Sequence, residues 1–209
     1  IVKAAGSDPE KFTELMKFYL WYGFVVIFGL VTMAFVVYPL IVKTMAGMGF
    51  GKFLGGVRDA QITAFSTSSS VATLPVTMDC LENKIGASKS TASFVLPIGA
   101  TVNMDGTSLY QAVAVVAMAQ FHMIDLSIAQ QAIIVGTATL ASIGAAAIPS
   151  AGLVLMMVVL ESVGLNPAWI AIIFPIDRIL DMCRTVVNVT GDATVTTIIA
   201  KSEDELKSE

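Results

Sequence analysis

The chain has 209 residues, of which 56% are hydrophobic and 13% are charged, and its formal net charge is −4. A soluble domain has about 45–50% apolar and about 25% charged residues, so this composition leaves too little polar surface for a soluble globule and predicts a membrane protein. No Lys- or Arg-rich patch suggests a nucleic-acid partner, and the two cysteines form no CxxC pair that would indicate a disulfide framework or a metal cage.

Both ends of the sequence are polar. The chain begins at Ile1 without a methionine and carries no signal peptide, so we expect it to be part of a longer polypeptide. Residues 1–15 contain the charged stretch SDPEKFTEL and are predicted to form a solvated lead segment. Residues 201–209, KSEDELKSE, are predicted to form a charged tail.

The first predicted element is a transmembrane helix over residues 16–43. Its central 25 residues, 18–42, carry no charge and are flanked by Lys17 and Lys43. About 20 apolar residues are enough to cross the hydrocarbon core of a bilayer. Aromatic residues lie near both ends of the stretch, as is typical of side chains at the membrane interface.

Two later stretches, residues 51–88 and 128–164, share an unusual plan. Apolar residues flank a centre of small residues, which reads STSSSVATLP in the first and SIGAAAIPSAG in the second. Each half is too short to cross a membrane comfortably, and irregular backbone survives at membrane depth only inside protein. The pattern predicts two re-entrant helical hairpins whose tips meet in the interior. The alternative is ordinary spans whose small residues serve helix packing.

A polar-marked helix is predicted after each hairpin, over residues 90–121 and 167–200. The order of hairpin, marked helix, hairpin and marked helix is an internal repeat. Interrupted hydrophobic segments at matching places in two halves indicate the binding site of a secondary transporter.

The last predicted helix carries a polar stripe. Its polar residues include Asp177, Asp181, Arg184, Asn188 and Asp192, which are three or four residues apart and therefore share one helical face. A charge in mid-membrane costs at least about 2.5–3.5 kcal/mol, so these groups need partners. Either they form a structural salt-bridge cluster between helices, or they form a site that takes a cation and an anion from outside.

The preceding marked helix contains NMDGT, residues 103–107. Asp105 is the only charge between Lys89 and Asp125. Gly106 permits an unwound turn that frees carbonyls such as those of Gly99 and Asn103. Carboxylate and carbonyl oxygens are the ligands that hard cations prefer. The motif therefore predicts half of a cation site, and Asn188 and Asp192 are candidates for the other half.

Four strings in this order, STSSSVATLPVTM, LPIGATVNMDGTSLYQ, ASIGAAAIPSAG and DRILDMCRTVVNVTGD, cover most of residues 60–200. In them the chain resembles the glutamate transporter family, the dicarboxylate/amino acid:cation symporters, and among these a prokaryotic acidic amino acid transporter. The resemblance implies an all-α integral membrane fold. The chain would be the half of a transport domain that holds two re-entrant hairpins and two marked transmembrane helices, one of them unwound at NMDGT.

The resemblance also implies how the protein works. It would be a multi-pass protein of the cell (inner) membrane, in contact with the lipid bilayer, that carries substrate and sodium by an elevator mechanism. It would form a homotrimer through helices absent from this chain, and residues 128–164 would be its gate. It would use Na⁺ at two to three sites, without an organic cofactor.

The family pattern assigns the ion ligands. The first sodium would bind the carbonyls of Gly99, Asn103 and Asn188 and the carboxylate of Asp192. The second would bind the backbone carbonyls of Thr101, Ser142, Ile143 and Ala145. The third would bind Asn103 and Asp105, together with groups from the missing helix.

The family pattern also assigns the substrate ligands. Arg184 would bind the side-chain carboxylate, for which a guanidinium is suited because it can donate two parallel hydrogen bonds. Asp181 would hold the amino group, and Thr107, Thr185 and Asn188 would add hydrogen bonds. The α-carboxylate would lie near Ser69, Ser70, Ile148 and Gly152. Arg184 and Asp181 together favour aspartate or glutamate.

The sequence departs from the family at three positions. Archaeal relatives carry an arginine at the position of Ser68 and animal relatives at that of Met182, and Arg178 is a candidate substitute. Gln111 stands where proton-coupled animal members have Glu, so we expect no proton co-transport. The alternatives are a proton- or sodium-coupled C4-dicarboxylate symporter or, more remotely, an ion channel. The chain lacks the Gly-x-Gly-Asp element that an intramembrane aspartyl protease requires, so we do not expect it to be an enzyme.

Overall fold

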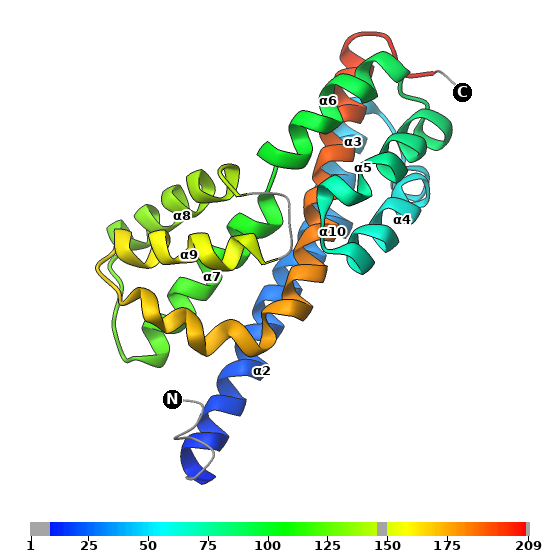
Figure 1. Ribbon diagram of the computed structural model, residues 1–209. Coiled ribbons are helices and arrows are strands. Elements are labelled where there is room, and N and C mark those ends of the chain that lie inside the picture. Colours follow the sequence, from blue (N-terminus) through cyan, green and yellow to red (C-terminus); the bar gives the residue numbers. More distant parts are fainter. Residues whose placement is uncertain (1–8, 146–149, 208–209) are drawn as a thin grey trace.

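A computed structural model describes residues 9–145 and 150–207 (Figure 1). These residues form helices and no strand, which confirms the all-α prediction. In chain order the elements are α2 (Pro9–Thr32), the π-helical turn η1 (Met33–Val37), α3 (Tyr38–Ala46), α4 (Phe50–Thr67), α5 (Ser70–Asp79), the π-helical turn η2 (Cys80–Ile85), α6 (Lys89–Val102), α7 (Asp105–Phe121), α8 (Ile128–Ile143), α9 (Ala151–Ser162), the 3₁₀ turn η3 (Pro167–Trp169) and α10 (Ile170–Ser202).

The first three elements form one continuous rod. Pro9–Ala46 is 38 residues long and, of the helices in the described residues, the one long and apolar enough to cross a membrane by length and composition. It contains the whole span predicted over residues 16–43. Leu20, Trp21, Phe24 and Phe28 are exposed on its surface. A membrane would supply the apolar surroundings that so many exposed aromatic and aliphatic side chains require.

A proline explains the π-helical turn inside this rod. Pro39 has no amide hydrogen, and its ring crowds the carbonyl of the preceding turn, so regular α-helical bonding cannot continue through it. The backbone widens instead over Met33–Val37, where the amide of Tyr38 donates to the carbonyl oxygen of Met33. Such single turns of π-helix are frequent at functional sites.

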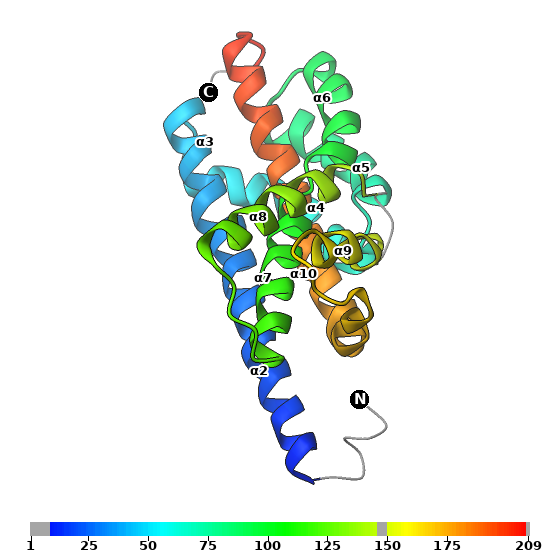
Figure 2. The same ribbon diagram turned by 90° about the vertical axis from the view of Figure 1, so that its left-hand side faces the viewer.

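Two helix pairs flank the long helix α10. The pair α4 and α5 lies on one side of it, and the pair α8 and α9 lies with α7 on the other (Figures 1 and 2). Ser68 ends α4 with a left-handed backbone at φ 53°, and the Ser69 side chain caps α5 by accepting from the amide of Ala72. These pairs correspond to the two predicted hairpins, and their re-entrant placement in a membrane stays a prediction.

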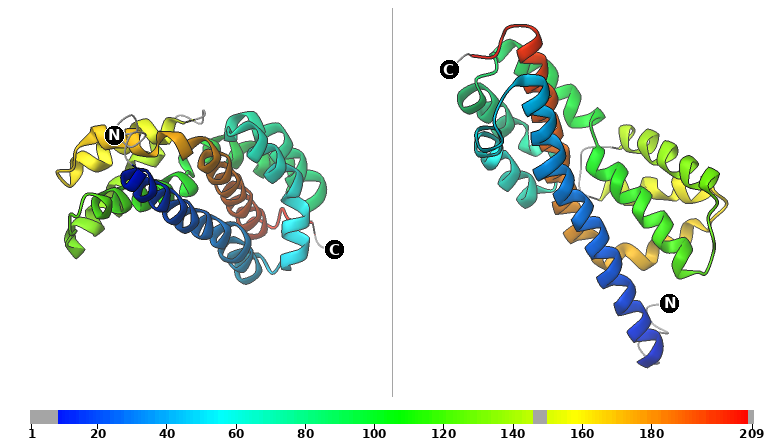
Figure 3. Two further views of the ribbon diagram at one scale, coloured as in Figure 1. Left: turned by 90° about the horizontal axis from the view of Figure 1, so that it is seen from below. Right: turned by 180° about the vertical axis from the view of Figure 1, so that it is seen from behind.

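The helix α10 is the centre of the fold. It has 33 residues and contacts α2, α3, α4, α6 and α7. Figure 3 shows the α2–α3 rod running beside it. Between α6 and α7 the chain leaves helical geometry at Asn103 and Met104, whose backbone angles are −88°/80° and −110°/46°. The interruption faces α10 at the level of its polar residues.

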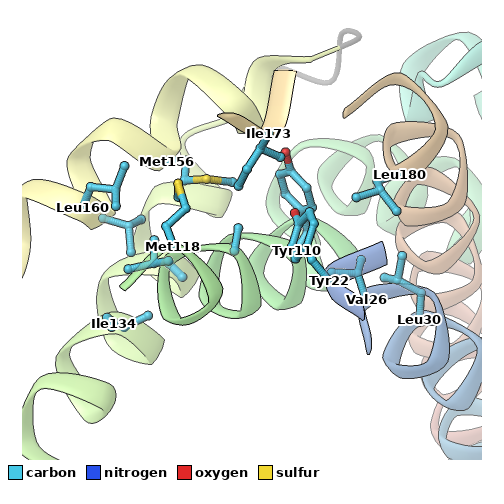
Figure 4. Close-up of a cluster of buried hydrophobic side chains, with 14 of the residues drawn as sticks. Tyr22, Val26, Leu30, Tyr110, Met118, Ile134, Met156, Leu160, Ile173 and Leu180 are labelled. Atoms are coloured by element: carbon cyan, nitrogen blue, oxygen red, sulfur yellow. The ribbon is translucent and has the colours of Figure 1, made fainter. Parts of the chain in front are cut away.

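A hydrophobic cluster joins α2, α7, α8, α9 and α10 (Figure 4). Tyr22 and Tyr110 lie together in this cluster, and Met156 and Ile173 lie near them. The buried methionines fill irregular gaps because their side chains are unbranched and flexible. This packing fixes α7 and α9 against α10 and so places the polar residues described below.

Glu205 and Leu206 are docked against the start of α6 and the two residues before it. The hydroxyls of Ser88 and Thr91 donate to the carboxylate of Glu205, and Leu206 forms an antiparallel bridge with Ala87. The hydrogen bonds from Ser88 and Thr91 lower the pKa of Glu205 below its usual value. The residues up to 207 are therefore held in place, whereas the sequence suggested only a charged tail.

Candidate functional site

A buried arginine lies at the middle of α10. The Arg184 side chain is 2% exposed, and its guanidinium is shared between two acids of the same helix. Nε donates to Asp181 Oδ1 at 2.8 Å, and Nη1 donates to Asp177 Oδ1 at 3.1 Å. The ring of Tyr110 lies beneath it, with its centroid 4.2 Å from Cζ. Burial of this charge is tolerable only because it is paired and hydrogen-bonded.

One nitrogen of the guanidinium, Nη2, makes no hydrogen bond within the part of the chain that the structure describes. Among the described residues, Arg184 Nη2 has no hydrogen-bond partner, although it lies 2.8 Å from Asp181 Oδ1. A buried donor that makes no hydrogen bond is costly and uncommon in native proteins. This nitrogen is therefore available to an acceptor that comes from outside the chain.

Tyr110 and Ser150, which the sequence did not assign to the site, donate hydrogen bonds to its two aspartates. Asp177 Oδ1 also accepts from the Tyr110 hydroxyl at 2.7 Å, and Asp177 Oδ2 accepts from Ser150 Oγ at 2.9 Å. The amide of Ser150 donates to Asp181 Oδ2 at 2.9 Å. Asp177 belongs to the predicted polar stripe, so its position was visible in the sequence. The role of Ser150, at the start of α9, depends on tertiary contacts that no local pattern reveals.

A small cavity of about 20 Å³ lies beside Arg184. Such a space holds about one water molecule and not an amino acid. It brings together seven of the nine predicted substrate residues, and Ser68, Met104, Ala145 and Ala151 complete its lining. The predicted seven are Ser70, Thr107, Gly152, Asp181, Arg184, Thr185 and Asn188. Both helix pairs thus contribute to one contracted polar site.

The other two predicted substrate residues are Ser69 and Ile148. The Ser69 side chain accepts from the Ala72 amide and so caps α5, and Ser69 is not among the described residues that line this cavity. Its assignment to the substrate stays a prediction. Ile148 lies outside the described residues. The neighbouring Ser68 lines the cavity instead, and its buried hydroxyl has no hydrogen-bond partner among the described residues. Arg178 is more remote, with a side chain 56% exposed and Nη1 3.8 Å from Asp181 Oδ2.

Glycines let the helices approach closely here. A Cβ on Gly106 would overlap the carbonyl oxygen of Arg184, and a Cβ on Gly152 would come within 2.7 Å of Thr107 Cγ2. The first contact is with backbone, which cannot swing aside. Gly106 is therefore required for α7 to pack against α10 at the site.

We expect Gly106→Ala to destabilise the protein by about 1–3 kcal/mol, because the added methyl overpacks a rigid contact. Gly136→Ala is the matched control, since a Cβ at this helical position on α8 meets nothing within 4 Å. The thermal unfolding midpoint in detergent measures both variants. Equal midpoints for Gly106→Ala and the wild-type protein would contradict the assigned packing.

A second polar cluster lies further along α10. Asp192 Oδ1 accepts from Asn103 Nδ2 at 2.9 Å, and the same nitrogen lies 3.3 Å from the carbonyl oxygen of Asn188. The amide of Gly106 donates to Asn188 Oδ1 at 2.8 Å. Gly99 faces the same acid, since its Cβ would lie 2.6 Å from Asp192 Oδ1. All four residues predicted for the first sodium are thus neighbours.

Some of the other predicted ion ligands lie close to one another in the structure, and some do not. Asn103, Asp105, Ser142 and Ile143 line a wider cavity of about 610 Å³ between α7 and α8. Ala145 lines the small cavity beside Arg184. The Thr101 side chain donates to the carbonyl of Ile98 on its own helix.

The donor set suits a hard cation. Among the described residues, no group of three or more His, Cys, Asp or Glu side chains is placed to hold a metal ion. Single carboxylates beside amide and backbone oxygens, as at Asp192 and Asp105, are the oxygen-rich surroundings that hard cations accept.

Comparison with known proteins identifies the family. A model of the sodium:dicarboxylate symporter family matches residues 2–202. The chain belongs to this family. As a sodium:dicarboxylate symporter family member it is part of a membrane protein, and the family consists of transporters, not enzymes.

Similar proteins carry more specific names. The chain is 47% identical over 202 residues, 96% of its length, to a Caenorhabditis elegans protein named as a candidate sodium-dependent excitatory amino acid transporter. It is 48% identical over 188 residues, 90% of its length, to excitatory amino acid transporter 1 of Rattus norvegicus. It is 49% identical over 187 residues, 89% of its length, to excitatory amino acid transporter 3 of Oryctolagus cuniculus.

The chain spans 35–40% of the length of these three relatives. All three are animal proteins, and the prokaryotic origin suggested by the sequence stays a prediction.

Proposed function

We propose that this chain forms the substrate- and ion-binding part of a sodium-coupled symporter of acidic amino acids, aspartate or glutamate. The observation that carries the proposal is the buried Arg184 beside a polar cavity, since its Nη2 is in ion contact with Asp181 but makes no hydrogen bond among the described residues. A neutral amino acid would leave this guanidinium without a ligand. The names of the relatives support the same substrate class.

Substrate binding would exchange one ion pair for two. In the structure, Asp181 neutralises Arg184 through Nε. A substrate carboxylate would accept from the free face of the guanidinium, while the substrate ammonium would take over the Asp181 carboxylate. Asp177 and Tyr110 would keep hold of Arg184 Nη1 and the ring face. Charges would remain paired throughout, so a membrane-embedded site could alternate between both states.

Asn188 would link substrate to sodium. Its Nδ2 atom faces Thr107 Oγ1 at 3.3 Å on the substrate side, while its carbonyl oxygen faces Asn103 on the ion side. A sodium ion held by Gly99, Asn103, Asn188 and Asp192 would fix the Asn188 backbone and thereby its side chain. Ion binding would thus prepare the substrate site, which is a coupling free energy between two ligands.

The remaining features of the proposal come from the sequence resemblance. They comprise the further sodium sites at Thr101, Ser142, Ile143 and Ala145 and at Asn103 and Asp105, and the α-carboxylate site near Ser69, Ser70, Ile148 and Gly152. They also comprise the gate at residues 128–164, the elevator mechanism, the homotrimer and the multi-pass topology in the cell membrane. Each stays a prediction.

Aspartate accumulation in proteoliposomes that contain the full-length protein tests the proposal. A tenfold inward sodium gradient supplies about 1.4 kcal/mol per ion, so at zero membrane potential we expect about tenfold accumulation of labelled aspartate per coupled sodium. Liposomes with equal sodium on both sides are the control. Accumulation that ignores the sodium gradient would contradict the coupling, and single-channel currents in place of saturable uptake would indicate the channel alternative.

A second candidate is a C4-dicarboxylate symporter, which the family description favours. Asp181 argues against it, because a substrate without an ammonium group would leave this acid unpaired. Unlabelled glutamate should therefore compete with labelled aspartate, and succinate should not.

A further inference from the structure

We propose that Tyr38 is a positioning residue for the Asp105 carboxylate, and that its hydroxyl sets the sodium affinity of the ion cluster. The inference rests on the proposed sodium coupling. The Tyr38 hydroxyl donates to Asp105 Oδ2 at 2.6 Å, across 67 residues of sequence. A hydrogen bond to a charged acceptor is short and about twice as strong as a neutral one.

The fold aims Tyr38 at this acid. Tyr38 is 5% exposed and begins α3 directly after the π-helical turn that Pro39 imposes. The widened turn changes the direction in which the following side chains leave the rod, relative to a regular α-helix. The tyrosine thereby meets the N-terminal end of α7, where Asp105 is the first helical residue.

The hydrogen bond leaves the other carboxylate oxygen available. Within residues 9–145 and 150–207, Asp105 Oδ1 accepts no hydrogen bond, and Asp105 lines the wide cavity together with Asn103. A phenol fixes a carboxylate without cancelling its charge, whereas a lysine or arginine in its place would neutralise it. Tyr38 therefore orients Asp105 and preserves the charge that attracts a cation.

The Tyr38 hydroxyl also lies close to the α10 backbone at Gly191, next to the second acid of the cluster. A Cβ on Gly191 would lie 2.8 Å from the Tyr38 hydroxyl oxygen and would also meet Asn103 Nδ2. Gly191 immediately precedes Asp192, whose carboxylate accepts from the same Asn103 nitrogen. The hydroxyl thus lies where α3, α7 and α10 meet, beside the ligands predicted for two sodium ions.

The test is sodium-dependent aspartate uptake by the full-length protein in proteoliposomes. Partners that orient a metal ligand typically contribute 10–100-fold to metal affinity, so Tyr38→Phe should raise the sodium concentration for half-maximal uptake about tenfold. The KM for aspartate at saturating sodium should stay within about twofold of wild type, because Tyr38 does not line the cavity beside Arg184. Tyr19→Phe is the matched control. It removes a tyrosine hydroxyl of the same rod, and this hydroxyl donates to the Ile172 carbonyl at 2.7 Å.

A double-mutant cycle separates positioning from general stability. If Tyr38 acts through Asp105, Tyr38→Phe should shift the sodium dependence of an Asp105→Asn variant by less than about twofold. A wild-type sodium dependence in Tyr38→Phe would overturn the inference and leave the proposed function intact. An equal loss of sodium and aspartate affinity with a lowered unfolding midpoint would also overturn it. Sodium-independent uptake by the wild-type protein would instead overturn the proposed function, and this inference with it.

Discussion

Replacing Arg184 with cysteine is expected to weaken aspartate binding by at least about a hundredfold, because two hydrogen bonds between charged groups contribute about 1.5–3 kcal/mol each. The change removes the only side-chain cation among the described residues that line the cavity and leaves Asp181 facing the substrate. Neutral amino acids, which have an ammonium group for Asp181 and no second carboxylate, should then compete better than in the wild-type protein. Inhibition constants of aspartate, glutamate, serine and alanine against labelled substrate measure the change.

The same substitution also destabilises the folded protein, and this loss of stability must be distinguished from the loss of aspartate binding. Removing one partner of a buried ion pair typically costs about 3–5 kcal/mol, and here both Asp177 and Asp181 lose their cation. Arg184→Lys keeps the charge and removes the planar fork, so it should be more stable than Arg184→Cys while still binding aspartate weakly. Both variants are compared by thermal unfolding in detergent as well as by uptake.

Arg178→Cys is the matched control for Arg184→Cys. Its side chain is 56% exposed and lies 3.8 Å from the same acid, Asp181. Exposed ion pairs contribute about 0–1 kcal/mol, so aspartate affinity should change by less than about fivefold. An Arg184→Cys protein with wild-type aspartate affinity would refute the substrate assignment. A large loss in Arg178→Cys would instead support Arg178 as the second arginine that the sequence suggested.

Helical periodicity made much of the site predictable. Residues three or four apart on one helix must share a face, so the common face of Asp181, Arg184, Asn188 and Asp192 follows from their spacing, and the structure shows all four buried. The composition predicted a membrane protein, and the resemblance to the glutamate transporter family implied the all-α fold that the described residues have. The helix predicted over residues 16–43 lies within a longer helical rod, Pro9–Ala46, because helix ends depend on capping and packing more than on the apolar pattern. That this rod crosses a membrane stays a prediction.

The parts that sequence did not predict are contacts between distant elements. Ser150 and Tyr110 reach Asp177 only because α7 and α9 pack against α10. Ser68, Ser69 and Ser70 are chemically alike, so the sequence could not distinguish their roles. The turn between α4 and α5 places the Ser69 side chain at the start of α5 as a cap, and it places Ser68 and Ser70 in the cavity lining. Tyr38 reads as an interfacial aromatic, and its role appears only once the π-helical turn is known.

The ion cluster leads to the second large expected effect. Asp192→Asn should raise the sodium concentration for half-maximal aspartate uptake by at least about thirtyfold. The carboxylate charge contributes about 4 kcal/mol to a cation 4 Å away at an effective dielectric constant of 20, and the amide dipole recovers part of it. The amide oxygen can still accept from Asn103 Nδ2, which donates to Asp192 Oδ1 at 2.9 Å in the structure. The substitution therefore removes charge while it keeps the local hydrogen bond.

Asp125→Asn is the matched control for this experiment, because Asp125 is exposed in the connection between α7 and α8. It should leave the sodium dependence unchanged. At saturating sodium the Asp192→Asn protein should recover aspartate binding, since Asp192 is not among the residues that line the cavity beside Arg184. A sodium dependence within about twofold of wild type would show that the Asp192 charge does not face the ion. The shared residue of the two sites, Asn188, would then link the substrate to α7 alone and not to sodium.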